Sequence, residues 1–240
     1  MPTNETLKSK KVIRQVLPIV LLLSVTGEFY RLIHPKEFTS TQTLPTEFVA
    51  QLRYATLPSF LRPLAVHYWF VVFSPEIKEW ERWELWQDTN AGGTSWGHIH
   101  KNLMYPGDGV GGGPSVIEME WRGAVAQNIY AVLNAPARYP YRDVYLPWPG
   151  PNSNTYIAWI LRQSQAAYDL DPRAIGKDYL GYLGGSVTTT GTGLQIESPV
   201  LGVKVGFYDG VELHLLCFTL GIDVWTPALK TPVGRFGFPD

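Results

Sequence analysis

The sequence predicts an α+β protein in which an antiparallel sheet packs with helices. Two stretches near the start, residues 64–73 and 77–87, have the composition and alternation of strands. Residues 124–134 carry a helical stripe, and residues 200–207 and 211–220 again have the pattern of strands. Strands followed by helices and then by further strands are typical of the α+β class.

The first elements predict a buried hairpin. Residues 64–73 are apolar at both alternating positions, which indicates a strand covered on both faces. Residues 77–87 alternate between apolar and charged side chains, and the turn-forming residues 74–76 separate the two stretches. Residues 95–104 predict a third strand, and residues 46–54 a short helix. The first half therefore supplies most of the expected sheet.

The middle of the chain predicts two helices, and the tail predicts a second hairpin. Residues 124–134 place apolar side chains at i, i+4, i+7 and i+8 from Val125. A second helix is expected over residues 154–168, and its first turns are apolar all round, which predicts their burial. Asp209-Gly210 separates the two tail strands and is a strong hairpin signal.

Composition excludes several classes of protein. The chain has 240 residues, 45% of them apolar and 17% charged, which excludes a disordered chain. The net charge of −1 provides no basic surface for nucleic acid. The single cysteine, Cys217, excludes a disulfide within the chain and a metal site built from cysteines alone. We expect Cys217 to be a small apolar residue within a strand.

The amino terminus differs from the rest of the chain. Four basic residues in residues 8–14 precede a mostly apolar run over residues 16–27, which resembles an export signal. We therefore expect residues 1–27 to be a signal or an anchor and residues 28–240 to form a single globular domain. The protein would then be exported or membrane-anchored on the periplasmic side, with membrane association through residues 12–27. The alternative is an apolar segment that docks on the domain.

The pattern that points most directly to chemistry combines a histidine on a strand with a polar helix start. His67 shares a strand face with Trp69, and Ser153 stands where the second helix begins. The free amides of a helix start stabilise a nucleophile or an oxyanion. Glu84 or Glu81 could orient His67, because the strand register is not fixed by the sequence. The alternatives are a helix cap at Ser153 and a hydrogen-bonded core histidine at position 67.

The remaining site predictions concern the neighbours of Ser153 and His67 and three other stretches. Asn152 and Asn154 flank Ser153 and are candidate oxyanion donors, and Trp69 is a candidate binding residue. His98 and His100 could supply two metal ligands, but no third ligand is evident, so no metal and no cofactor is predicted. Residues 107–112 match G-x-G-x-x-G without a following helix, which argues against dinucleotide binding. The tryptophan stripes at residues 80–86 favour core packing over a ligand groove.

Five strings in the chain are distinctive: AVHYW at residues 65–69, WPGPNSNTY at 148–156, AIGKDY at 174–179, GTGLQ at 191–195 and PALK at 227–230. Together they resemble an uncharacterised bacterial family labelled as domain of unknown function 3750. The resemblance covers about residues 60–235. Members tend to begin with a hydrophobic segment, which supports the export prediction.

The order of histidine and helix start is also similar to the circularly permuted papain-like group of NlpC-type and lecithin:retinol acyltransferase-like proteins. This resemblance implies a permuted papain-like fold with His67 as base, Ser153 at the cysteine position and Glu84 in the third place. It implies a hydrolase or acyltransferase acting on an amide or ester of a small molecule, peptide or lipid. The alternative is a non-catalytic cell-envelope binding protein that uses the same cleft.

Overall fold

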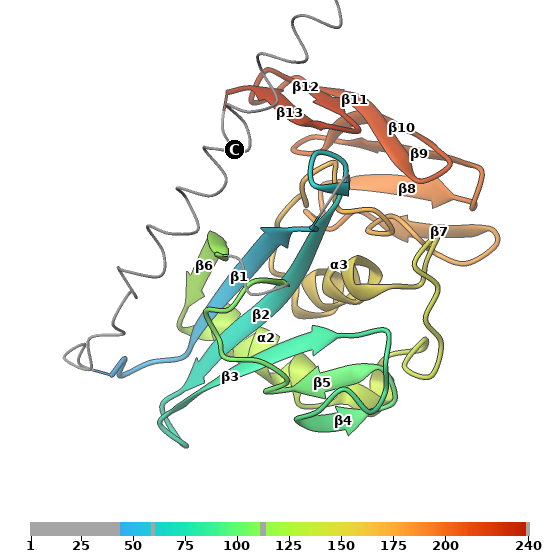
Figure 1. Cartoon of the computed structure of the whole chain (residues 1–240). Helices are drawn as coiled ribbons and strands as arrows, with labels where there is room; N and C mark the ends of the chain where they lie inside the picture. Colours follow the sequence, from blue (N-terminus) through green and yellow to red (C-terminus); the bar gives the residue numbers. More distant parts are fainter. Residues whose placement is uncertain (1–43, 59–60, 111–113, 239–240) are drawn as a thin grey trace, which may run out of the picture. The chain divides into compact units, whose positions relative to one another are not determined.

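Strands dominate the computed structural model, which describes residues 44–58, 61–110 and 114–238 (Figure 1). Two antiparallel sheets of six and seven strands account for the regular structure, together with two α-helices and one 3₁₀ turn. The predicted α+β, permuted papain-like class is therefore wrong, and the protein is mostly β. The sequence underestimated the number of strands, because many of them are only three to six residues long and rich in glycine.

The six-stranded sheet contains the predicted hairpin at its centre. Its order is β4-β5-β3-β2-β1-β6, and its pairing is antiparallel throughout. The predicted partners 64–73 and 77–87 are confirmed as β2 and β3, which pair from Phe70 with Trp83 to Ser74 with Glu79. The strands are β1 (Val49–Thr56), β2 (Val66–Ser74), β3 (Glu79–Leu85), β4 (Thr94–Trp96), β5 (Ile99–Lys101) and β6 (Val116–Arg122).

The seven-stranded sheet is a meander in which each strand pairs with the next one along the chain. The predicted tail hairpin is confirmed, with Gly210 opposite Gly206. The strands are β7 (Gly184–Val187), β8 (Gly193–Glu197), β9 (Leu201–Gly206), β10 (Gly210–Leu215), β11 (Phe218–Asp223), β12 (Ala228–Thr231) and β13 (Gly234–Gly237).

The apolar core lies between one face of the six-stranded sheet and the helices α2 (Ala124–Leu133) and α3 (Ser153–Ser164). Tyr68 and Phe70 of β2 face the helices, and α3 buries nine of its twelve residues. Figure 1 shows α3 between the two sheets, and Arg162 of α3 donates hydrogen bonds to Val187 O and Gln195 Oε1 in the second sheet. The helix therefore contacts both sheets.

Four local predictions differ from the structure. Residues 46–54 form most of β1 rather than a helix, because this segment pairs with β2 on one side and β6 on the other. Residues 95–104 contain two short strands instead of one. Residues 211–220 are divided by a turn at Leu216 and Cys217, both of which have left-handed φ angles. The predicted helix at 154–168 begins at Ser153 and ends at Ser164.

The described residues belong to one compact unit that spans residues 44–240. The predicted signal or anchor segment, residues 1–27, lies outside the described residues. Within the described part of the chain, neither helix has the length and apolar character needed to cross a bilayer.

Candidate functional site

The start of α3 is held by its own capping residue. The Asn152 side chain accepts hydrogen bonds from the backbone N–H groups of Asn154 and Thr155, and the Thr155 hydroxyl accepts one from the Asn152 N–H. The Asn152 amide also donates to Pro147 O and Ile175 O. This capping box satisfies the orphan donors of the first helical turn. The side chain of Asn152, a predicted oxyanion donor, is therefore engaged in the helix cap and with two backbone carbonyl groups.

Asn154 ties the same helix start to β2. Its Oδ1 accepts from the Tyr68 N–H at 3.2 Å, and its Nδ2 donates to Val66 O at 2.9 Å. The two residues flank His67, beyond the point where β3 pairs with β2. Nδ2 donates further to Ile175 O, so the amide of Asn154, the other predicted oxyanion donor, is engaged with three backbone groups. The tie brings the beginning of α3 to the backbone on both sides of His67.

His67 is part of a buried charged network on the sheet face opposite the helices. Its Nε2 lies 3.2 Å from Glu84 Oε2, and Arg82 binds both oxygens of Glu84 at 2.7 and 2.9 Å. Burial alone would raise the pKa of Glu84, but the hydrogen bonds from His67 and Arg82 outweigh it and lower the pKa. Glu84 is therefore ionised near neutral pH, and the structure pairs His67 with it rather than with Glu81.

Glu81 has a different set of partners. Its carboxylate accepts hydrogen bonds from Lys101 Nζ at 3.0 Å and Trp83 Nε1 at 3.1 Å. Adjacent strand residues point to opposite faces, so the even-numbered Arg82 and Glu84 share the His67 face and Glu81 does not. The register that the sequence left open decides between the two glutamates.

Ser153 is the first residue of α3 and keeps 7% of its surface exposed. Within the described residues, no hydrogen bond engages its hydroxyl, and none joins it to His67, which is 5% exposed. The first two capped amides belong to Asn154 and Thr155. The Ser153 N–H has no hydrogen-bond partner among the described residues. It is therefore the amide of the first turn that can donate to a ligand beside the Ser153 hydroxyl.

The tryptophans near His67 pack inside the protein. Trp69 is fully buried, donates through Nε1 to Pro106 O and lies 4.3 Å from the Arg82 guanidinium. Its ring stacks on His67 at 5.9 Å, and Trp86 meets His67 edge-on at 5.4 Å. Trp69, the predicted binding residue, is therefore fully buried and packs against His67 and Arg82.

His98, His100 and Cys217 have structural surroundings. His98 Nδ1 bonds to Trp86 O, and both ring nitrogens of His100 bond to carbonyl oxygens, of Gly92 and Asp88. These contacts hold the loop between β3 and β4 and leave no nitrogen of His100 for a metal. Cys217 lies in the turn between β10 and β11 rather than in a strand, and burial raises the pKa of its thiol to about 11.

A second group of charged residues, which the sequence analysis missed, lies under the seven-stranded sheet. It consists of four acids and four bases that pair with one another and are almost completely buried. At its centre, Glu212 accepts from Lys204 at 2.9 Å, Lys177 at 3.2 Å and His214 at 3.0 Å. The signal was a polar residue at every second position of apolar strands. The buried ionic cluster comprises Asp169, Lys177, Asp178, Glu197, Lys204, Glu212, His214 and Lys230.

Three members of the buried ionic cluster, Asp178, Glu212 and His214, bring their ligand atoms within 4.8 Å of one another. Such a triad resembles a metal site. However, the lysine ammonium groups already bind the same carboxylates at 2.6 to 3.2 Å. Four bases balance four acids, because the pKa of His214 is raised to about 9. The cluster therefore has the donor set of an ion-pair network and does not fit a metal ion.

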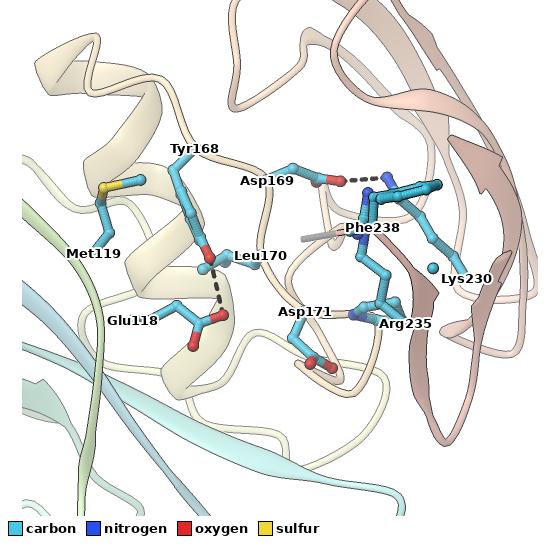
Figure 2. A pocket seen from close by; sticks show the side chains of 11 residues that line it. Glu118, Met119, Tyr168, Asp169, Leu170, Asp171, Lys230, Arg235 and Phe238 are labelled. Carbon is cyan, nitrogen blue, oxygen red and sulfur yellow. Dashed lines mark hydrogen bonds and ion pairs between the residues drawn. The ribbon is translucent and has the colours of Figure 1, made fainter. Parts of the chain in front are cut away.

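A cavity of about 460 Å³ opens beside the buried ionic cluster (Figure 2). In this close-up, Tyr168 points to Glu118 at 2.9 Å and Asp169 to Lys230 at 2.5 Å. The cavity is lined by Glu118, Met119, Tyr168, Asp169, Leu170, Asp171, Pro172, Lys230, Arg235, Gly237 and Phe238. Neither His67 nor Ser153 lines it, so the two regions are distinct.

Fold and site together define a mostly β protein with a capped helix start tied to a buried histidine–glutamate–arginine network. The chain belongs to the family described as a protein of unknown function (DUF3750), whose model matches residues 47–179. The match covers the six-stranded sheet and both α-helices, and it ends before β7. The strings at residues 191–195 and 227–230 therefore lie outside it. Searches of curated proteins and of solved structures find no significant match.

Proposed function

We propose that the protein is a cell-envelope hydrolase or acyltransferase that acts on an ester or amide bond, with Ser153 as nucleophile and His67 as base. The observation that carries the proposal is the double hydrogen bond of Asn154 to Val66 O and the Tyr68 N–H, which holds the start of α3 against the backbone on both sides of His67. The location follows from the basic and apolar pattern of residues 8–27.

The pairing with Glu84 gives His67 the tautomer that a base needs. Because Glu84 is ionised, it accepts a hydrogen bond, and the Nε2–H of His67 donates it. In this tautomer Nδ1 carries the lone pair. Arg82 holds both oxygens of Glu84, which fixes the orientation of the carboxylate. An oriented base with a defined tautomer is the arrangement found in nucleophile–base–acid sites.

In the reaction, Ser153 Oγ attacks the carbonyl carbon of the substrate while His67 Nδ1 takes the hydroxyl proton. The carbonyl oxygen becomes an oxyanion that the Ser153 N–H and the positive end of α3 stabilise. Collapse of this intermediate expels the alcohol or amine, which receives the proton from His67. Water then releases a carboxylic acid, or an acceptor hydroxyl or amine takes the acyl group, with His67 again moving the proton.

The proposal requires Ser153 and His67 to form a hydrogen bond when substrate binds. A fluorophosphonate probe tests this, because it phosphonylates an activated serine with loss of fluoride. We expect the full-length protein to be labelled, and we expect Ser153→Ala and His67→Gln each to reduce the labelling rate at least about 100-fold, the usual contribution of a general base. Mass spectrometry of the labelled peptide would locate the adduct.

Ser164→Ala is the matched control. Ser164 lies in the same helix, is buried and donates to Ile160 O at 2.7 Å, so its loss perturbs α3 without touching the site. Its labelling should equal that of the unsubstituted protein. Circular dichroism would confirm that each variant is folded. A folded protein that no fluorophosphonate labels, or one labelled at another serine, would refute the proposal.

The second candidate function is non-catalytic binding in the cell envelope. It is favoured by the absence of a hydrogen bond between Ser153 and His67 in the described structure and by the engagement of both asparagine amides. In that case His67, Glu84 and Arg82 would only stabilise the sheet. His67→Gln would then lower the free energy of unfolding, and the unsubstituted protein would remain unlabelled.

A further inference from the structure

The seven-stranded sheet has an apolar outer face. Paired residues of neighbouring strands share a face, so the registers define three rows that cross the sheet. Every member is an apolar side chain with 37% to 68% of its area exposed. The first row is Val187, Leu194, Val205, Val211, Ile222, Leu229 and Phe236. The second is Ile196, Val203, Leu213 and Leu220, and the third is Leu201, Leu215 and Phe218.

The alternation along each strand is the reverse of that in a water-soluble sheet. In β10, Val211, Leu213 and Leu215 are exposed, whereas Glu212 and His214 between them are buried. The inner side chains belong to the buried ionic cluster, whose partners in residues 169–178 are fixed. Turning the sheet over would separate the ion pairs that its inner side chains make with Asp169, Lys177 and Asp178, so the outward position of the apolar rows is built into the fold.

The area of the outer face calls for a covering surface. The first row crosses seven strands, about 29 Å, whereas the second and third cross four and three strands, about 14 and 10 Å, so the rows enclose roughly 220 Å² of the sheet plane. The half-exposed side chains of all 14 members add to this area. The largest apolar patch on a typical monomer is about 300–600 Å² and is usually functional. A face of this size without a charged side chain in its rows is a binding surface.

The chemistry of the rows selects hydrocarbon over protein. A protein interface makes about one hydrogen bond per 100–200 Å². The three rows contain no side chain that donates or accepts a hydrogen bond, which a hydrocarbon layer does not require. At one end of the strands, Phe207, Tyr208 and Trp225 pack together at 4.6 to 5.8 Å and remain exposed. Tyrosine and tryptophan favour the boundary between headgroups and acyl chains.

We propose that the outer face of β7–β13 docks on the acyl-chain layer of a phospholipid membrane, with Phe207, Tyr208 and Trp225 at the level of the headgroups. The rows carry no charge, so the contact does not depend on anionic lipid. This surface consists of residues other than those of the apolar amino-terminal segment, and it does not depend on the chemistry proposed for Ser153.

A fluorescent probe on the sheet tests the contact in the full chain. Leu213 lies at the centre of the rows, and Leu213→Cys in a Cys217→Ser background gives one site for an environment-sensitive nitrobenzoxadiazole label. On addition of phosphatidylcholine vesicles we expect a blue shift and a several-fold rise in emission, and quenching by lipids that carry a nitroxide on the acyl chain. A label at Ile77→Cys, equally exposed in the turn between β2 and β3, should not respond.

The measurement separates the face from the amino-terminal segment, because it reports the surroundings of residue 213 even if another segment brings the chain to the vesicle. An unchanged spectrum at position 213 would overturn the proposal. A label that is already blue-shifted without vesicles and insensitive to lipid nitroxides would overturn it too, and it would mean that protein, either the amino-terminal segment or a second copy of the chain, covers the face.

Discussion

Two buried histidines hold comparable positions in the two sheets, and their partners give them different tasks. His67 bonds to one carboxylate that Arg82 already neutralises. His214 lies between Glu197 at 2.8 Å and Glu212 at 3.0 Å, with Asp178 at 3.4 Å. Burial opposes the charged imidazole of His214, but the field of Asp178 and the two hydrogen bonds outweigh it and raise its pKa to about 9. His214 is therefore a cation that the fold needs.

The raised pKa of His214 predicts a loss of stability in mild alkali. An unfolded histidine has a pKa near 6.5, so the charged form favours the folded state fully below about pH 6.5, and this contribution is lost as the pH rises through about 9. The free energy of unfolding should fall by about 3 kcal/mol across this window. Urea unfolding at pH 6.5 and pH 9 measures it, and the decrease should largely disappear in His214→Gln. An equal decrease in the free energy of unfolding in the two proteins would contradict the raised pKa of His214.

At the scale of elements, α3 takes the place of a strand. Beside Val66 and Tyr68, β3 no longer pairs with β2, and the Asn154 amide satisfies the backbone groups that the missing strand would have used. Buried backbone groups require such partners. The sequence showed that the helix would begin with polar residues, but local pattern could not show that one of them completes a sheet 86 to 88 residues earlier.

Removing the Asn154 side chain, which takes the place of the missing strand, should lower the free energy of unfolding. Asn154→Ala leaves the Tyr68 N–H and the Val66 carbonyl buried without partners, and we expect it to lower the free energy of unfolding by about 2–4 kcal/mol. Asn134→Ala is the control, because Asn134 is exposed and donates a single hydrogen bond to Tyr130 O at the end of α2. It should cost less than about 1 kcal/mol. Urea titration measures both, and similar losses would refute the role of Asn154.

At the scale of the whole molecule, the two sheets are stabilised by different forces. The six-stranded sheet buries an apolar core against α2 and α3. The seven-stranded sheet instead turns ion pairs inward, through Lys204 and Lys230 to Asp169 and through Lys177 to Glu212. A buried ion pair adds little net stability while it is intact, but the loss of one partner leaves an uncompensated charge.

This difference predicts selective unfolding. Lys204→Met removes the cation that binds Asp169 and Glu212, and it should cost about 3–5 kcal/mol. Hydrogen exchange should show the loss of protection in β7–β13 first, while β1–β3 remain protected. Lys78→Met, at an exposed turn, should change neither region. A uniform loss of protection across both sheets would contradict the separation.

The sequence predicted elements well where one local pattern dominated. Residues 64–73 and 77–87 formed the expected hairpin, and residues 124–134 the expected helix, because β2 is buried on both faces, as its continuous apolar run predicts, and α2 on one, as its helical stripe predicts. Residues 46–54 became a strand because β2 and β6 offered partners on both sides. The turn at Leu216 was missed because neither residue at its centre is a usual turn former.

The candidate site, like the fold, could be predicted from the sequence only in part. The sequence identified His67 and Ser153 by residue type, whereas the register of β2 and β3 decided that Glu84 and not Glu81 meets the histidine. The sequence also proposed roles for Asn152, Asn154 and Trp69. It could not show the distant backbone groups that engage them, such as Ile175 O and Pro106 O, because spacing along the chain does not reveal such contacts.

The sequence by itself determined which side chains share a face in the tail, because alternation along a strand is fixed by the backbone. It did not determine which face points inward. The tertiary structure decided that Glu212 and His214 are buried and Leu213 is exposed, since Lys177, Asp178, Lys204 and Glu197 lie close enough to neutralise them. Charges are buried only where opposite charges meet them, and that meeting is made by segments far apart in the chain.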